Sequence, residues 1–368
     1  MSSNQIMTNL LLLTVCFLTF LFRNSRKGLR NALVLSTVLL AFFAYHFYPT
    51  KDMDLAHHFI SVNTLKNSGH FFESTQIDVL PGFRILLQII SKMPSEHYLP
   101  AFVALVVYGL LFFIIFDWAN TIGKRRELWI TVTLFCCTLS FIGTISNVRN
   151  AMGVTIFVTA LYLELIKKRN RIICWLLMAI AASIHPAITI FILIRILVQF
   201  YTKYSQKPIL VALFLFPLIL QYSVPMVSQY IKIPYFSYVI EKIDLYIFEA
   251  SEFNAKRFYV CLFQLFVYTF IILRYRKRNS ESLLMWDNYI LCVLVFTYAT
   301  IGKYILMVRM ADSLLVLCCP YVVSEARMEA EKKLTVNRFS ALIILFSISM
   351  LLLHNFYSGY YYASNYVW

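Results

Sequence analysis

Apolar runs of roughly membrane-spanning length follow one another along most of this chain. A helix needs about 20 apolar residues to cross the hydrocarbon core of a bilayer, and about 17 can suffice. By that measure the sequence predicts spans near residues 6–22, 29–48, 100–118, 128–147, 151–166, 172–185, 187–202, 208–224, 258–274, 284–301, 304–323 and 338–357. Two of them meet at His185-Pro186 and could also be one broken helix. We therefore expect an all-α polytopic integral membrane protein with about twelve (roughly eleven to thirteen) transmembrane helices.

Charged residues make up only 14% of the 368 residues, whereas soluble domains carry about 25%. No polar stretch is long enough to form a soluble domain of its own. Residues 1–368 are therefore expected to form a single transmembrane domain.

Basic residues gather in short clusters between the predicted spans. The clearest clusters are RNSRKGLR (23–30), GKRR (123–126), KKRNR (167–171) and RYRKR (274–278). Cytoplasmic loops of membrane proteins carry such an excess of Lys and Arg. The pattern predicts that both termini and two long loops, 49–99 and 225–257, lie outside. The net charge of +15 is distributed over short clusters between spans, so no nucleic-acid partner is expected.

The first long outer loop contains an amphipathic segment, LPGFRILLQIISKM (80–93), with a proline at the expected helix start. Its polar residues recur at helical spacing and are Arg84, Gln88, Ser91 and Lys92. The opposite face is apolar and consists of Ile85, Leu86, Ile89, Ile90 and Met93. Because the segment is too short to span, it predicts a helix lying on the outer surface.

An acidic segment, KDMDLAHHF (51–59), opens the same loop and places Asp52, Asp54, His57 and His58 near the outer interface. A carboxylate there could take a proton from a sugar hydroxyl as a general base. An Asp-x-Asp pair could instead bind a divalent cation through its oxygens. The segment could also be only a helix cap followed by a solvated loop.

Arg149 lies in SNVRNAMG (146–153), at the outer start of a predicted span. Ser146 or Asn147 can cap that helix, which places Arg149 in its first turn. The helix dipole is already positive at this end. An added cation favours a phosphate or diphosphate ligand, although Arg149 could also extend toward lipid headgroups.

Further ionisable residues occur within or at the edges of spans, where charge is costly and commonly functional. They are His185, Arg195, Lys303, Arg309 and Asp312. Lys303 and Arg309 are nearly two helical turns apart and could face one cavity. Arg309 could instead pair with Asp312 on one face, His185 could bind a backbone carbonyl, and Arg195 is expected to be structural.

These segments are where the chain resembles a known family, the EpsG-type membrane proteins, one group of Wzy-like polysaccharide polymerases. The resemblance rests on KDMDLAHHF, LPGFRILLQII, VRNAMGVTIFVTALYL, SIHPAITIFI and VRMADSLLVLCCPY, which occur in the family's order. Two positions differ from the family pattern. Asn150 stands where the family often has Gln, and Pro186 replaces a small polar residue.

The resemblance implies a GT-C-like glycosyltransferase of the bacterial inner membrane. Its donor would be a glycan on a polyprenyl diphosphate such as undecaprenyl diphosphate, and its acceptor a lipid-linked repeat unit of O-antigen, capsule or exopolysaccharide. Asp52 or Asp54 would be the base, with His185 in reserve, and Arg149 and Arg309 would stabilise the leaving diphosphate. The other expected substrate-binding residues are Lys303, Arg84 and His57. Neither a metal nor a cofactor is expected, and the partners would include membrane lipid, a flippase and a chain-length regulator.

Two other functions would fit a chain of this kind. A flippase for lipid-linked oligosaccharides would also have about twelve spans, but its halves should be related by a repeat, and none is evident. A membrane O-acyltransferase would use an intramembrane His and a cytoplasmic acyl donor, but few histidines lie near the predicted cytoplasmic side.

Overall fold

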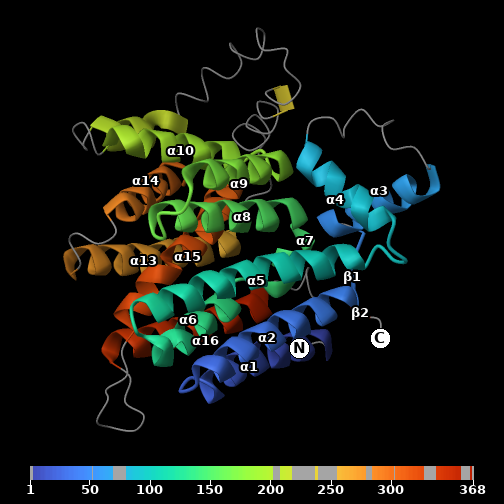
Figure 1. Ribbon diagram of the computed structural model, residues 1–368, viewed down its shortest axis with the longest axis horizontal. Coiled ribbons are helices and arrows are strands. Elements are labelled where there is room, and N and C mark those ends of the chain that lie inside the picture. The colour runs from blue at the N-terminus through green and yellow to red at the C-terminus, as the bar shows by residue number, and fades with distance from the viewer. Residues whose placement is uncertain are drawn as a thin grey trace. The chain divides into compact units, whose positions relative to one another are not determined.

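The computed structural model describes residues 3–51, 53–68, 80–201, 208–217, 237–238, 255–278, 284–301, 303–326, 337–357 and 365–366. Almost all of the ordered elements are helices (Figure 1). They are α1 (Ser3–Leu21), α2 (Arg26–Tyr45), β1 (Phe47–Tyr48), α3 (Asp54–Ser68), α4 (Pro81–Ser91), α5 (Tyr98–Thr121), the 3-10 helix η1 (Arg125–Glu127), α6 (Leu128–Thr138), α7 (Phe141–Ser146), α8 (Val148–Leu165), α9 (Arg171–Ile184), α10 (Ile188–Tyr201), α13 (Ala255–Arg278), α14 (Leu284–Ala299), α15 (Tyr304–Glu325), α16 (Arg338–Tyr357) and β2 (Asn365–Tyr366).

Within the described residues, five helices are long and apolar enough to cross a membrane, namely α2, α5, α8, α13 and α15. Shorter apolar helices include α1, α9, α10, α14, α16 and the segment 208–217. The chain is therefore an all-α polytopic membrane protein, as the sequence predicts, and its full number of spans stays a prediction.

The residues form two compact units. Unit 1 comprises residues 1–73, 85–159 and 319–368, and unit 2 comprises residues 74–84 and 160–318. In unit 1, α2 packs along α5, and α1 packs against both α2 and α6 (Figure 1). The Trp118 indole of α5 donates to the Pro320 carbonyl at 2.9 Å and to Ser324 Oγ at 3.0 Å, so unit 1 joins distant parts of the chain.

The predicted span 128–147 is two helices rather than one. Leu139 and Ser140, between α6 and α7, both have ψ angles of 118°, which is extended backbone. The Ser140 hydroxyl accepts a hydrogen bond from the Gly143 amide at 3.1 Å and thereby caps α7. Most of α7 is buried within the protein. At membrane depth, irregular backbone is tolerated only when protein or a water-filled cavity surrounds it.

Helix α4 forms where the amphipathic pattern predicts it, but its polar face is turned inward. Arg84 and Gln88 are only 8% and 5% exposed, whereas Ile85 and Ile89 are 56% and 51% exposed. A helix lying on the membrane surface would instead leave its polar residues in water. The predicted orientation is thus wrong for Arg84 and Gln88, which are buried together with Leu86 and Ile90, whereas Lys92 of the same polar face is exposed.

The two short β-strands of the structure belong to unit 1. Phe47 pairs with Tyr366 and Tyr48 with Asn365, in antiparallel register. This contact attaches a segment near the C-terminus to the chain just ahead of the acidic segment.

In unit 2, the chain breaks where the His185-Pro186 pair predicts a break. α9 ends at Ile184, His185 has extended backbone with φ −141° and ψ 122°, and α10 begins at Ile188. Helix α10 packs on α14, where the Tyr289 hydroxyl donates to the Phe191 carbonyl at 3.3 Å.

Candidate functional site

The acidic segment leads directly into α3, which packs on α7. Met53 precedes α3, and its sulfur accepts a hydrogen bond from the Ser146 hydroxyl at 3.8 Å. Ser146 ends α7, and α8 begins at Val148. Three helices of unit 1 thus bring the acidic segment toward the first turn of α8, where Arg149 lies as predicted.

His58 shows most directly that these groups interact. The side chain is 8% exposed, and burial together with the positive charges of Arg149 and His57 lowers its pKa to about 4, while Asp54 opposes this shift. The imidazole is therefore neutral at pH 7. Asp54, His57 and Arg149 therefore all lie within electrostatic range of His58 in unit 1.

Three of the predicted residues of this group lie within the part of the chain that the structure describes. Asp54 is exposed in the first turn of α3, where a carboxylate is favoured by the helix dipole. His57 is exposed and Arg149 is half-buried. Asp52 lies outside the described residues.

The sequence reasoning did not include His58 among the site residues. Asp54 and His58 are four residues apart on α3, so their side chains share one helix face. That spacing is visible in the sequence and could have identified the pair.

A second group of predicted residues lies in unit 2. His185 is 4% exposed at the end of α9, and Arg84 is buried near the start of α4. Gly82 of α4 packs so closely on Ser183 of α9 that a Cβ at Gly82 would collide with the serine hydroxyl. The start of α4 and the end of α9 are therefore in contact, and each carries one of the two buried groups.

Lys303 and Arg309 also belong to unit 2. Lys303 immediately precedes α15, and its carbonyl accepts from the Met307 amide at 3.0 Å. Lys303, Arg309 and Asp312 are all half-buried. The hypothesis that Lys303 and Arg309 face one cavity stays a prediction, as does a single site shared with Arg149.

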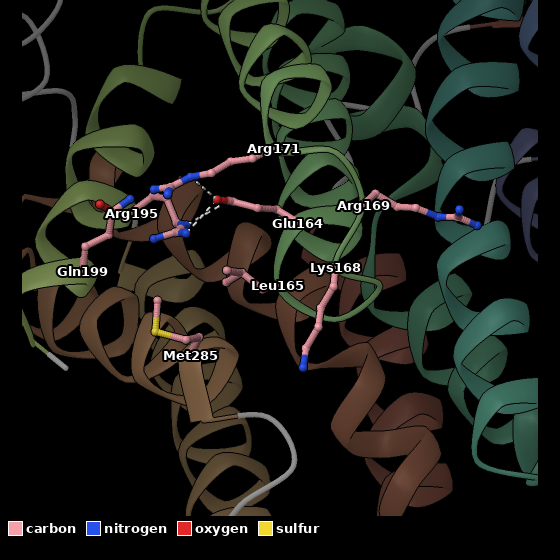
Figure 2. Close-up of a pocket in the computed structure, with 8 residues that line it drawn as sticks. All are labelled: Glu164, Leu165, Lys168, Arg169, Arg171, Arg195, Gln199 and Met285. Atoms are coloured by element: carbon pink, nitrogen blue, oxygen red, sulfur yellow. Dashed lines mark hydrogen bonds and ion pairs between the residues drawn. The ribbon is translucent and has the colours of Figure 1, made fainter.

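Arg195 has the structural role expected of it. Its Nε and Nη2 atoms donate to the two carboxylate oxygens of Glu164 at 3.0 and 2.7 Å (Figure 2). Among the residues that the structure describes, no group of three or more His, Cys, Asp or Glu side chains could hold a metal ion.

Comparison with known proteins identifies the family. The model of the EpsG family matches residues 33–368, a range that contains every segment on which the resemblance rests. No curated protein matched the chain, and neither did any solved structure. Because the family match covers nearly the whole sequence, the chain belongs to the EpsG family of polysaccharide polymerases.

Proposed function

We propose that this protein transfers a glycan from a polyprenyl diphosphate, such as undecaprenyl diphosphate, onto a lipid-linked repeat unit at the outer face of the bacterial inner membrane. Membership of the EpsG family indicates a membrane polysaccharide polymerase. The observation that carries the finer proposal is the grouping of Arg149 on α8 with Asp54 and His58 on α3. A cation and a carboxylate thus both act on one imidazole, and the proposed reaction uses a group of each kind.

Arg149 would bind the diphosphate of the donor. It lies in the first turn of α8, where the positive end of the helix dipole already favours an anion. Because His58 is neutral at pH 7, it adds no second positive charge to this group. The guanidinium fork can donate two parallel hydrogen bonds to phosphate oxygens, which strengthen as the leaving diphosphate gains charge.

The acceptor hydroxyl would attack the anomeric carbon of the donor sugar. The bond from that carbon to the diphosphate oxygen breaks, and its electron pair leaves with the diphosphate. The hydroxyl proton moves to a carboxylate, for which Asp54 and Asp52 are the candidates and His185 the reserve. Arg149 and Arg309 supply the positive charge that the leaving group needs, so we propose a metal-independent reaction.

Arg84, Lys303, Arg309 and His57 are proposed to contact other parts of the lipid-linked substrate. Arg84 is buried in α4 and Arg309 is half-buried in α15, so both are partly shielded from solvent, which strengthens binding to a charged group. A flippase and a chain-length regulator are the proposed protein partners.

Polymerisation of purified lipid-linked repeat units by the purified full-length chain tests the proposal. Arg149→Ala should abolish long products, and Arg149→Lys should retain part of the activity because it keeps the charge but loses the fork. Asp54→Asn, or Asp52→Asn if that residue is the base, should slow transfer about 10²- to 10⁴-fold. Arg126→Ala is the control, since it removes an exposed arginine from another basic loop.

Three outcomes would contradict parts of this proposal. Full-length polymer from both Arg149 variants would remove Arg149 from diphosphate binding. Normal rates in both Asn variants would leave His185 as the next base candidate, and complete loss of activity in EDTA would refute the metal-independent reaction. Cells that lack the gene should accumulate single repeat units, and normal polymer in those cells would refute the function itself.

A further inference from the structure

A cavity of about 410 Å³ lies in unit 2, at the end of α8 that is far from Arg149. Glu164 lies fifteen residues beyond Arg149 in the same helix, which is about 22 Å at 1.5 Å per residue. This distance approaches the thickness of a bilayer core, about 30 Å. The cavity is therefore separate from the first turn of α8, where Arg149 lies.

Polar side chains dominate the wall of this cavity. They are Glu164, Lys168, Arg169, Arg171, Arg195 and Gln199. In Figure 2, Arg171 and Arg195 converge on Glu164 from two directions, and Arg169 points away from them. Apart from Arg169, the wall thus carries three cationic side chains and one carboxylate, which leaves it positively charged.

Glu164 is already well supplied with hydrogen-bond donors. Besides the two bonds from Arg195, its Oε1 atom accepts from the Trp175 indole at 3.3 Å and lies 3.5 Å from Nε of Arg171. One carboxylate neutralises at most one of the cations. The remaining positive charge favours an additional anion at this wall.

Arg195 points to the same conclusion independently. The side chain is 3% exposed, and its Nη1 atom has no hydrogen-bond partner among the described residues. A buried donor without an acceptor is costly, and a guanidinium group presents its donors in a planar fork that fits carboxylate or phosphate oxygens. The unpaired Nη1 of a side chain that lines the cavity therefore indicates a missing acceptor.

The helices that border the cavity favour an anion as well. α9 begins at Arg171, and its first amides lie at the positive end of the helix dipole. The Asn170 side chain caps this helix by accepting from the Ile172 amide at 2.9 Å. The cluster KKRNR (167–171) beside it is predicted to be cytoplasmic.

We propose that this cavity binds a phosphate group, supplied by the headgroup of an anionic lipid in the cytoplasmic leaflet or by a soluble phosphate. The volume lies within the range of about 300–1,000 Å³ typical of ligand pockets. Arg195 would bind the phosphate through Nη1, with Arg171 and Lys168 at the mouth. The site does not depend on the function proposed for the opposite end of α8.

Native mass spectrometry of the purified full-length chain tests this site, with phosphatidylglycerol, phosphatidylcholine and inorganic phosphate as the probes. Each cation that is removed should weaken binding about fivefold. Arg171→Gln should therefore have this effect, and Lys168→Gln combined with Arg171→Gln a larger one. Arg171 is largely exposed, with 63% of its side chain accessible, so these variants should fold. Arg126→Gln is the control of equal charge change.

Preference for phosphatidylglycerol over phosphatidylcholine, lost in the double variant, would identify the lipid headgroup as the ligand. Binding of inorganic phosphate without phosphatidylglycerol, lost in the same variant, would identify a soluble phosphate. The proposal is overturned if the double variant binds each probe as tightly as the Arg126→Gln control does.

Discussion

Removing one member of the buried ion pair between Glu164 and Arg195 should destabilise unit 2 strongly. Arg195 donates to both carboxylate oxygens, at 3.0 and 2.7 Å, and both side chains are less than a tenth exposed. Arg195→Met keeps much of the apolar volume but leaves the carboxylate buried without its main partner. Removing one member of a buried pair costs about 3–5 kcal/mol.

Two further variants separate this charge effect from packing. Glu164→Gln combined with Arg195→Met removes both charges and should recover much of the loss, because neutral replacement of a buried pair is often tolerated. Arg171→Met removes a cation that is 63% exposed and 3.5 Å from Glu164. Exposed pairs contribute about 0–1 kcal/mol, so this change should cost little.

Unfolding by SDS in mixed micelles measures these differences, and tryptophan fluorescence is a suitable signal because the Trp175 indole donates to Glu164. Arg195→Met should lower the unfolding free energy several times more than Arg171→Met. The reasoning would be refuted if Arg195→Met lowered the unfolding free energy by less than about 1 kcal/mol, no more than Arg171→Met does. That result would show that the pair is not stabilising.

Two other predictions concern pH and topology. The pKa of His58 is lowered to about 4 in the folded chain, whereas a histidine in the unfolded chain has a pKa of about 6.5. Between these two pH values the unfolded chain binds a proton that the folded chain does not bind. The stability of the folded chain should therefore fall on acidification from about pH 6.5 to about pH 4. The loss should be about 2 kcal/mol from pH 7 to pH 5, and an equal loss in His58→Gln would exclude His58 as its source. A cysteine replacing His70, in the predicted outer loop 49–99, should react with a membrane-impermeant maleimide in intact spheroplasts, and labelling only after the inner membrane is permeabilised would refute the predicted topology.

Local chain chemistry explains what the sequence could predict. The helices begin and end near the predicted span limits because apolar runs and basic clusters mark them directly. Pro186 likewise marks the break between α9 and α10. The break at Leu139 and Ser140 has no proline or glycine at those positions, so hydropathy alone merges α6 with α7.

Tertiary contacts explain what the sequence could not predict. The periodicity of α4 shows two faces but not which one meets protein, and in a membrane the apolar face can meet lipid instead. His58 gains its low pKa from burial and from Arg149, which is 91 residues away in the chain. The partner of Arg195 is 31 residues away, on another helix. Pairings of this kind depend on how the helices pack, which composition and spacing do not reveal.

The six-residue helix α7 has a consequence for how the chain can vary in length. Helix α7 follows the capping residue Ser140, and only Asn147 lies between the end of α7 and the start of α8, which carries Arg149 in its first turn. Each residue of an α-helix turns the chain by about 100°. A single inserted or deleted residue within α7 would rotate Arg149 by about a quarter of a turn and shift it along the axis, away from α3. Between Ser140 and Arg149 the number of residues is therefore constrained in addition to the buried side chains, and we expect homologous chains to keep this length.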